Sequence, residues 1–284
     1  MVRYLIAGAS GMLGTDLGIA LSGRDTVTLS RAELDIADLD AVRTAVRGFD
    51  VVINAAAYTR VDDAETNEDA ANLVNAVGAG NVALAAAEGG ATLVHYSTDY
   101  VFDGTATTPY AEDHPTHPVT AYGRSKAEGE RLVLERGPER TFLLRTAYLY
   151  GEHGPNFVAT MLRLAGERDT VSVVTDQVGQ PTWTADVAAQ TVALLDSDAS
   201  AGIYHATNSG SASWFEFARA IFEAAGLDSA RVLATDSAHY VQRAPRPAYS
   251  VLGHDAWASA AIPEMRDWRE ALRGATERGI IGAR

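Results

Sequence analysis

The sequence predicts an α/β protein built on a Rossmann-type, doubly wound parallel sheet with a smaller C-terminal α/β lobe. Two observations predict this fold. Short apolar runs alternate with helical stretches through the first half of the chain, as strands and helices do in parallel sheets. The first apolar run also leads into a glycine-rich turn that is followed by a helical stretch. The expected strands lie at residues 4–7, 27–29, 51–53, 92–96 and 142–145.

The alternation loosens from about residue 150. Helices are expected near residues 157–167, 185–195, 214–225 and 268–276, and short strands near 171–174 and 203–205. We therefore expect a Rossmann domain over residues 1–150 and a smaller lobe over residues 151–284, with some interleaving of the chain between the two.

The composition limits the class of protein. A length of 284 residues with 47% hydrophobic and 21% charged residues suits a globular protein with a substantial core. The formal net charge of −14 argues against a nucleic-acid or anionic-membrane partner, because both require clustered cations. The absence of cysteine excludes disulfides, thiolate metal ligands and a cysteine nucleophile. No signal-peptide layout is recognised, and no apolar run approaches the roughly 20 residues of a membrane span, so we expect a cytoplasmic protein.

The glycine-rich turn at residues 8–14 has the pattern G-x-x-G-x-x-G. Gly8, Gly11 and Gly14 allow a tight turn and a close approach of the backbone, and the next helix offers free N–H groups to a pyrophosphate. Glycine-rich turns alone are common, but the position between a strand and a helix predicts dinucleotide binding.

The residues after the second strand bear on the choice of dinucleotide. NAD-binding proteins place an acidic residue there, on the ribose hydroxyls, whereas this chain has Ser30 and Arg31. A hydroxyl and a guanidinium suit a 2′-phosphate, so NADPH is favoured, with NADH possible. The alternative is that Arg31 is a solvated loop residue. Asp35 either accepts from the adenine amino group or caps a helix that begins near Asp38.

Tyr122 and Lys126 are four residues apart, on one face of a predicted helix. An ammonium favours the phenolate and lowers the pKa of a tyrosine, which makes the pair a candidate acid/base device. Lys126 is the one lysine among 23 basic residues. A Y-x-x-x-K match is frequent by chance, so the alternative is a surface helix. Ser97, Thr98 and Asp99 end the fourth strand, where open α/β sheets bind ligands.

The order of these motifs resembles the extended short-chain dehydrogenase/reductase family, and within it the dTDP-4-dehydrorhamnose reductases. The matching segments are N-A-A-A-Y-T-R-V-D-D-A-E at 54–65, Y-S-T-D-Y-V-F-D-G at 96–104, Y-G-R-S-K at 122–126, R-T-A-Y at 145–148, N-F at 156–157, D-Q-x-G-x-P-T at 176–182 and R-P at 246–247. The similarity spans nearly the whole chain.

The resemblance implies NAD(P)H-dependent reduction of the C4 ketone of a nucleotide-linked 4-keto-6-deoxyhexose, most simply dTDP-4-dehydro-L-rhamnose. It implies that Tyr122 donates the proton, that Lys126 lowers the tyrosine pKa and binds the nicotinamide ribose, and that Thr98 polarises the carbonyl. The implied cofactor contacts are Gly8, Gly11, Met12, Leu13, Gly14, Ser30, Arg31, Asp35, Ile36, Ala56, Ala57, Tyr58, Tyr122 and Lys126. The implied substrate contacts are Thr98, Asp99, Tyr100, Tyr148, Asn156 and Gln177.

Two departures and three alternatives remain. Tyr148 stands where the family commonly has a tryptophan that lines the sugar pocket, so the resemblance leaves the preferred sugar open. Asp16 lies near a metal position of some dimeric relatives, but no further ligands can be placed, so we predict no metal and a monomer or homodimer.

Three alternatives to this function remain. They are a 4-ketoreductase for a different dTDP-6-deoxy sugar, a nucleotide-sugar epimerase or dehydratase, and a non-catalytic relative. Trp214, Phe215 and Phe217 are interpreted as core residues.

Overall fold

The computed structural model describes residues 1–239 and 242–281. Its strands are β1 Arg3–Ala7, β2 Asp25–Leu29, β3 Val51–Asn54, β4 Thr92–Thr98, β5 Thr141–Thr146, β6 Leu149–Tyr150, β7 Val171–Val174, β8 Val178–Gly179, β9 Thr182–Trp183, β10 Gly202–His205, β11 Ala212–Ser213 and β12 Val232–Thr235. Its α-helices are α1 Met12–Ala20, α2 Leu39–Val46, α3 Val61–Ala64, α4 Glu68–Asn72, α5 Ala79–Gly89, α6 Ala121–Arg136, α7 Phe157–Glu167, α8 Thr184–Leu195, α9 Trp214–Ala224, α10 Asp255–Ser259 and α11 Trp268–Glu277. A π-helix, η1, spans Leu73–Gly78, and short 3-10 helices span Asp99–Val101 and Ser229–Arg231.

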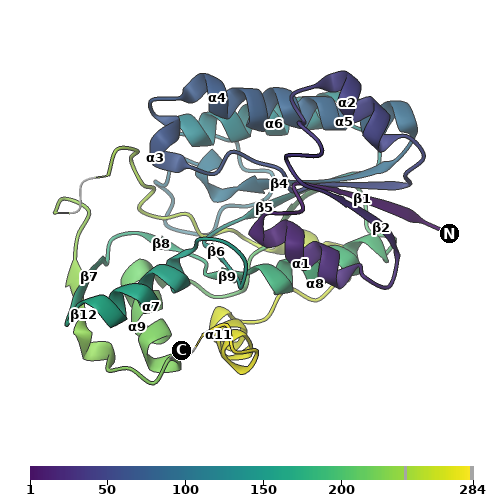
Figure 1. Cartoon of the computed structure of the whole chain (residues 1–284). Helices are drawn as coiled ribbons and strands as arrows, with labels where there is room; N and C mark the ends of the chain where they lie inside the picture. The colour runs from purple at the N-terminus through teal and green to yellow at the C-terminus, as the bar shows by residue number, and fades with distance from the viewer. Residues whose placement is uncertain (240–241, 282–284) are drawn as a thin grey trace.

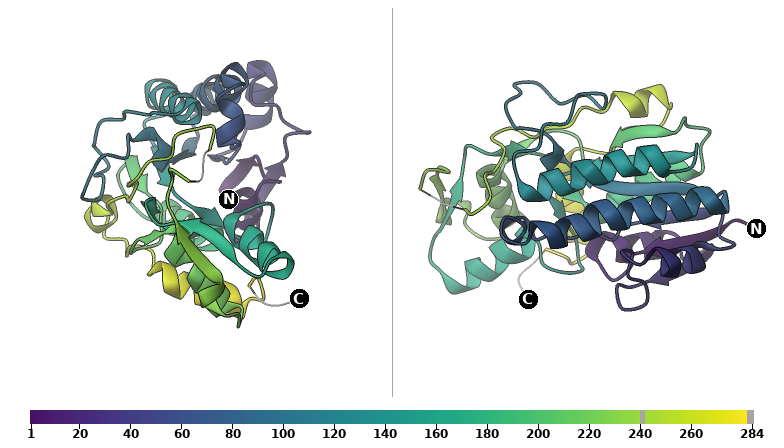
Figure 2. Two further views of the ribbon diagram at one scale, coloured as in Figure 1. Left: turned by 90° about the vertical axis from the view of Figure 1, so that its left-hand side faces the viewer. Right: turned by 90° about the horizontal axis from the view of Figure 1, so that it is seen from above.

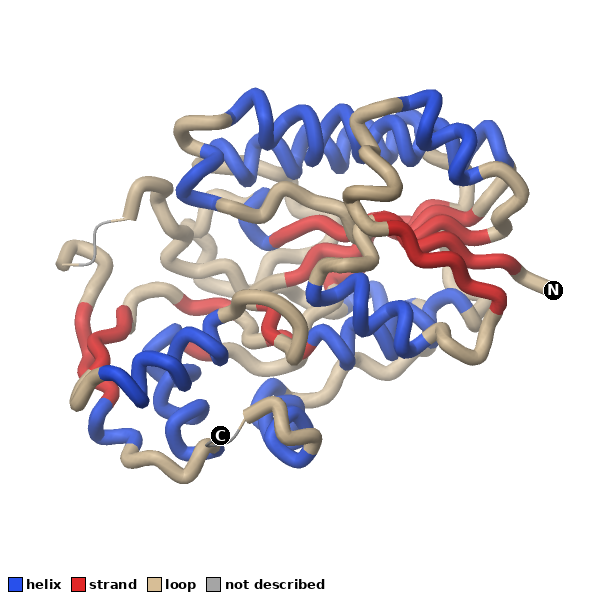
Figure 3. The backbone as a smooth tube through the Cα atoms, in the orientation of Figure 1, coloured by secondary structure: helices blue, strands red, loops and turns tan. Residues whose placement is uncertain are grey.

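The larger part of the molecule is built on a six-stranded sheet with the order β10-β5-β4-β3-β1-β2 (Figures 1 and 3). All five neighbouring pairs are parallel. The chain passes from β1 outward to β2 and then returns to β3 on the other side of β1. This reversal opens a crevice at the carboxyl ends of β1 and β3, which is where open α/β sheets bind ligands. The predicted doubly wound parallel sheet is confirmed.

Helices cover both faces of this sheet. In Figure 1, α1 and α8 lie below it, and α2, α5 and α6 lie above it. Alternate side chains of β1 explain the two layers, because Ile6 packs in the core with α1 and α8, and Leu5 packs in the core with α2 and α5. Every residue of β3 is buried, which is why the central strands are continuous apolar runs in the sequence.

The smaller lobe has its own core. Helices α7, α9 and α11 pack with the parallel pair β7–β12 around Trp183, Phe217 and Trp268 (lower left in Figure 1). The helices expected near 157–167, 214–225 and 268–276 form within one residue of those bounds. The strand expected at 203–205 is β10, which pairs with β5 of the larger sheet, and α8 also packs on that sheet. The chain therefore crosses between the two cores.

A nearly continuous helical segment runs from Glu68 to Gly89 through α4, η1 and α5, beside α6 (Figure 2). By length and composition this segment could cross a membrane, with a mean hydropathy of 1.3. The expectation that no segment approaches a membrane span is therefore wrong for these residues. Most of their apolar side chains pack in the core, although Leu73 and Val77 are exposed, and 61% of the apolar window is buried within the protein. Core packing accounts for the hydropathy.

Candidate active site

A cavity of about 700 Å³ lies at the carboxyl ends of the central strands. Its walls come from the glycine-rich turn, the ends of β3, β4 and β5, the start of α6 and the smaller lobe. The structure brings most of the predicted site residues to this cavity: Gly8, Gly11, Met12, Leu13, Gly14, Arg31, Asp35, Ile36, Ala56, Ala57, Tyr58, Thr98, Asp99, Tyr100, Tyr122, Lys126 and Tyr148.

The glycine-rich turn fits a dinucleotide. Gly8 has a φ of +79°, and a Cβ there would lie 2.5 Å from the backbone nitrogen of Ala56. A Cβ at Gly14 would lie 2.3 Å from the Gly8 carbonyl oxygen. Only glycine permits this crossing of the turn, α1 and the end of β3. No side chain of the described residues caps the N-terminus of α1, so its first N–H groups remain available to an anion such as a pyrophosphate.

Packing of α6 against η1 and β4 places the Tyr–Lys pair. Thr120 caps α6 by accepting from the N–H of Gly123. Further along the helix, a Cβ at Gly129 would lie 2.0 Å from the Asn75 carbonyl oxygen of η1, so only glycine allows this contact. Lys126 Nζ donates to the Tyr96 carbonyl oxygen at 2.6 Å. The helix thus holds the lysine head group beside the end of β4.

Burial controls the ionisation of this pair. Tyr122 and Lys126 are 8% and 2% exposed. Burial raises the pKa of Tyr122 well above its ordinary value, although a hydrogen bond with Thr98 lowers it in part. Burial also lowers the pKa of Lys126 to about 8, with Glu130 acting in the opposite direction. Desolvation of the phenol is the largest influence on the pKa of Tyr122, and the ammonium of Lys126 is directed to the Tyr96 carbonyl. That Lys126 lowers the pKa of Tyr122 stays a prediction.

The end of β4 supplies further polar groups. Thr98 Oγ1 donates to Asp99 Oδ1 at 3.0 Å and accepts from the N–H of Tyr100 at 3.2 Å. Burial raises the pKa of Asp99 to about 6, while hydrogen bonds from Ser250 and Thr98 counteract part of that rise. Near neutral pH the cavity therefore holds a buried aspartate beside a tyrosine that keeps its proton.

Tyr148 forms the wall on the side of the smaller lobe. Its φ of +45° is unusual for a bulky residue and marks a locally strained backbone. The ring stacks on Trp214 with 3.7 Å between centroids and an interplanar angle of 10°. It also covers Gly179, where a Cβ would lie 2.5 Å from Tyr148 Cζ. Trp214 packs against the core of the smaller lobe, as interpreted, and also lines the cavity, whereas Phe217 is fully buried. The sequence itself does not indicate which of the neighbouring aromatic residues, Trp214 or Phe215, faces the cavity.

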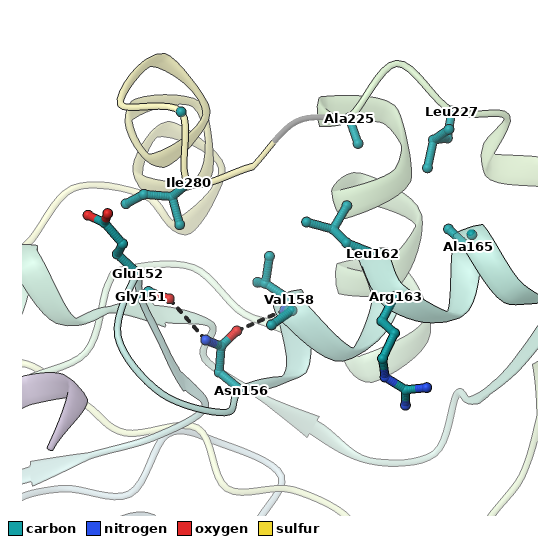
Figure 4. A pocket seen from close by; sticks show the side chains of 13 residues that line it. Gly151, Glu152, Asn156, Val158, Leu162, Arg163, Ala165, Ala225, Leu227 and Ile280 are labelled. Atoms are coloured by element: carbon teal, nitrogen blue, oxygen red, sulfur yellow. Dashed lines mark hydrogen bonds between the residues drawn. The ribbon is translucent and has the colours of Figure 1, made fainter. Parts of the chain in front are cut away.

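Three predicted site residues do not line the cavity, because intramolecular hydrogen bonds hold their side chains. Ser30 donates to Glu33. Gln177 donates to Ser237 Oγ at 2.8 Å. Asn156 caps α7 by accepting from the N–H of Ala159, and its Nδ2 donates to the Gly151 carbonyl (Figure 4). Asn156 lines a separate cavity of about 560 Å³ beside α7 and the end of α9.

Several lining residues were not predicted from the sequence. They are Ser10, Leu34, Ala55, Thr59, Val61, Val74, Tyr96, Thr146, Ala147, Leu149, Gly154, Pro155 and Trp214. Those next to a recognised motif could have been found by extending it, but the segment at 154–155 carries no motif. Among residues 1–239 and 242–281, no group of three or more His, Asp or Glu side chains is placed to hold a metal ion.

The parallel sheet with its glycine-rich turn, the buried Tyr–Lys pair and the hydroxyl at the end of β4 together define a class, the extended short-chain dehydrogenases/reductases. Comparisons with known proteins identify the family within this class. The family model described as the RmlD substrate binding domain matches residues 2–279. The chain belongs to this family, the dTDP-4-dehydrorhamnose reductase family, and is an oxidoreductase, as the sequence predicted.

Relatives match along almost the whole chain. A dTDP-4-dehydrorhamnose reductase of Streptomyces griseus is 49% identical over 278 residues, covering 95% of this chain and 91% of the relative. A probable dTDP-4,6-dihydroxy-2-methyloxan-3-one 4-ketoreductase of Streptomyces antibioticus is 48% identical over 283 residues, covering 96% and 94%. The crystal structure of a dTDP-4-dehydrorhamnose reductase of Bacillus anthracis in complex with NADP is 39% identical, with a TM-score of 0.93 and coverage of 98% and 100%.

Proposed function

We propose that this protein uses NADPH to reduce the C4 ketone of a nucleotide-linked 4-keto-6-deoxyhexose, with dTDP-4-dehydro-L-rhamnose as the leading substrate and dTDP-L-rhamnose as the product. The observation that carries this proposal is the single cavity that joins the dinucleotide turn, the Tyr–Lys pair and Thr98. The names of the relatives supply the substrate class. The complex of the Bacillus anthracis relative with NADP supports the cofactor.

The residues of the cavity have separate roles in the proposed reaction. The turn at residues 8–14 and the N-terminus of α1 hold the pyrophosphate, and Arg31 holds a 2′-phosphate. When bound, NADPH supplies the hydride. Thr98 donates to the carbonyl oxygen, and Tyr122 gives its proton to the alkoxide as charge develops there. Because burial keeps Tyr122 protonated, the free enzyme is ready for reduction. Lys126 binds the nicotinamide ribose, and its ammonium stabilises the tyrosinate that remains after Tyr122 has given its proton to the alkoxide.

A second candidate is the same reaction on a different dTDP-6-deoxy sugar. Tyr148 supports it, because this residue differs from the family's usual tryptophan and forms the wall toward the smaller lobe. A relative from Streptomyces niveus that is 47% identical is named dTDP-4-keto-6-deoxy-D-glucose reductase. An epimerase or dehydratase is less well supported, since Asp99 is followed by Tyr100 rather than a second acid. We also propose a cytoplasmic monomer or homodimer whose first 150 residues bind the dinucleotide.

The experiment follows NADPH oxidation at 340 nm with freshly generated dTDP-4-dehydro-L-rhamnose and with dTDP-4-keto-6-deoxy-D-glucose. Turnover of the first substrate supports the leading candidate, and turnover of the second alone supports the alternative. No turnover of either, by protein that binds NADPH, contradicts both. Replacement of NADPH by NADH, in wild type and in Arg31→Ala, tests the role of Arg31, which requires that the variant lose its preference for NADPH.

A further inference from the structure

The turn after β2 is closed by one carboxylate. The backbone N–H and the hydroxyl of Ser30 both donate to Glu33 Oε2, at 2.8 and 2.6 Å. The N–H groups of Glu33 and Leu34 in turn donate to the Ser30 carbonyl oxygen, at 3.1 and 3.0 Å. Side chain and backbone therefore stabilise each other, and the only hydroxyl hydrogen of Ser30 is already committed.

The same turn forms the edge of the dinucleotide cavity. Arg31, Leu34, Asp35 and Ile36 line it. Arg31 is exposed, and no salt bridge joins it to any carboxylate in the part of the chain that the structure describes. Glu33 is also exposed, and the hydrogen bonds from Ser30 lower its pKa, so it is ionised at neutral pH. The turn therefore carries the guanidinium of Arg31 together with two carboxylates, Asp35 at the cavity wall and Glu33 two residues from Arg31 in the sequence.

We propose that Glu33 is a specificity-determining residue that weakens selection of NADPH over NADH. It withholds the Ser30 hydroxyl from a 2′-phosphate and places a negative charge in the same turn as Arg31. Arg31 attracts the phosphate, Glu33 repels it, and the ribose hydroxyls of NADH encounter neither a repulsion nor a specific cation. The wild-type protein therefore binds both dinucleotides, with a modest preference for NADPH. This inference rests on the dinucleotide-binding part of the proposed function and is independent of the sugar.

The matched variant is Glu33→Gln, which keeps an acceptor oxygen for Ser30 but removes the charge. Glu139→Gln is the control, because Glu139 is exposed and lies just before β5, which three strands separate from β2, and the variant changes the net charge equally. Affinities are measured by isothermal titration calorimetry with NADPH, NADH and 2′,5′-ADP, without any sugar nucleotide. Binding of NADH by each variant shows that its fold is intact.

The expected result is that Glu33→Gln binds NADPH and 2′,5′-ADP about five-fold more tightly, with NADH unchanged, as removal of one solvated charge repulsion at close range predicts. Glu139→Gln leaves all three affinities unchanged. An unchanged ratio of NADPH to NADH affinity in Glu33→Gln, or an equal gain for both dinucleotides, overturns the inference. If NADPH binds but no sugar nucleotide is reduced, the proposed substrate fails and the Glu33 inference is still decided by these affinities.

Discussion

Lys126 Nζ donates to the backbone carbonyl of Tyr96 at 2.6 Å, two residues before Thr98 in β4. This contact joins α6 to β4 and sets the distance between the proposed proton donor, Tyr122, and the proposed carbonyl donor, Thr98. Because the carbonyl satisfies only one of the three ammonium hydrogens, the other two remain available to a ribose. Lys126 therefore links α6 to β4 in the free protein, in addition to its proposed role as a ligand for the cofactor.

Tyr122→Phe is expected to lower kcat by roughly 100- to 10,000-fold, because the alkoxide loses its proton donor. NADPH affinity changes little, since the ring and its burial are retained. Single-turnover and steady-state kinetics check this. Tyr204→Phe is the matched control, because Tyr204 donates to the Ser200 carbonyl near the edge strand, away from the cavity. A Tyr122→Phe variant with near-normal turnover would contradict the assignment.

The pH dependence of kcat/KM reports the ionisation of Lys126 in the free enzyme. Burial lowers the pKa of this lysine to about 8, so the ammonium is present below pH 8 and is lost as the pH rises through that value. We expect an alkaline limb near pH 8 in the wild type. In Lys126→Arg the guanidinium stays charged, so the limb shifts upward even though the level of activity falls. The same limb in both proteins would show that another group is responsible.

Asp99 is expected to lower stability at neutral pH. Burial raises its pKa from 3.8 to about 6, so between these values the folded state binds more protons than the unfolded state, and stability falls as the pH rises. Above pH 6 this amounts to roughly 3 kcal/mol. Asp99→Asn should therefore be more stable than the wild type at pH 7, by up to that amount, and no more stable near pH 3.5. Urea unfolding at the two pH values measures the difference.

Asp196, a carboxylate whose pKa is lowered rather than raised, provides the control for Asp99. Arg24 hydrogen-bonds to Asp196 and lowers its pKa, so Asp196→Asn removes a favourable interaction. This variant should be slightly less stable than the wild type at pH 7, since the pair is half-exposed. If Asp99→Asn were also destabilising at pH 7, burial would not be the dominant influence on Asp99.

Gly179→Ala tests the wall formed by Tyr148. A Cβ at this position would lie 2.5 Å from Tyr148 Cζ, so the ring must leave its stack on Trp214. We expect kcat/KM for the sugar nucleotide to fall by up to roughly 100-fold, with NADPH affinity retained. Gly166→Ala is the control, because nothing lies within 4 Å of a Cβ there. If Gly179→Ala and Gly166→Ala had the same kcat/KM, Tyr148 would not contribute to substrate binding.

Much of the fold was predictable because its signals are local. Buried central strands such as β3 are continuous apolar runs, and the turn at residues 8–14 has its own glycine pattern. The assignment of residues 203–205 to the larger sheet was not predictable in this way. Strand pairing between β10 and β5 joins segments some 60 residues apart. The sequence of a short apolar strand does not indicate with which other strand it pairs.

The sequence by itself determined the doubly wound sheet, the dinucleotide turn, and the presence of Tyr122, Lys126 and Thr98 at helix and strand positions that meet at one edge. Only the tertiary structure decided that Lys126 is directed to the Tyr96 carbonyl, that Ser30 is held by Glu33, and that Trp214 faces the cavity. The physical reason is that ionisation and hydrogen bonding depend on desolvation and on partners brought together by folding. Hydrophobic periodicity and glycine spacing are properties of neighbouring residues and are visible in the chain itself.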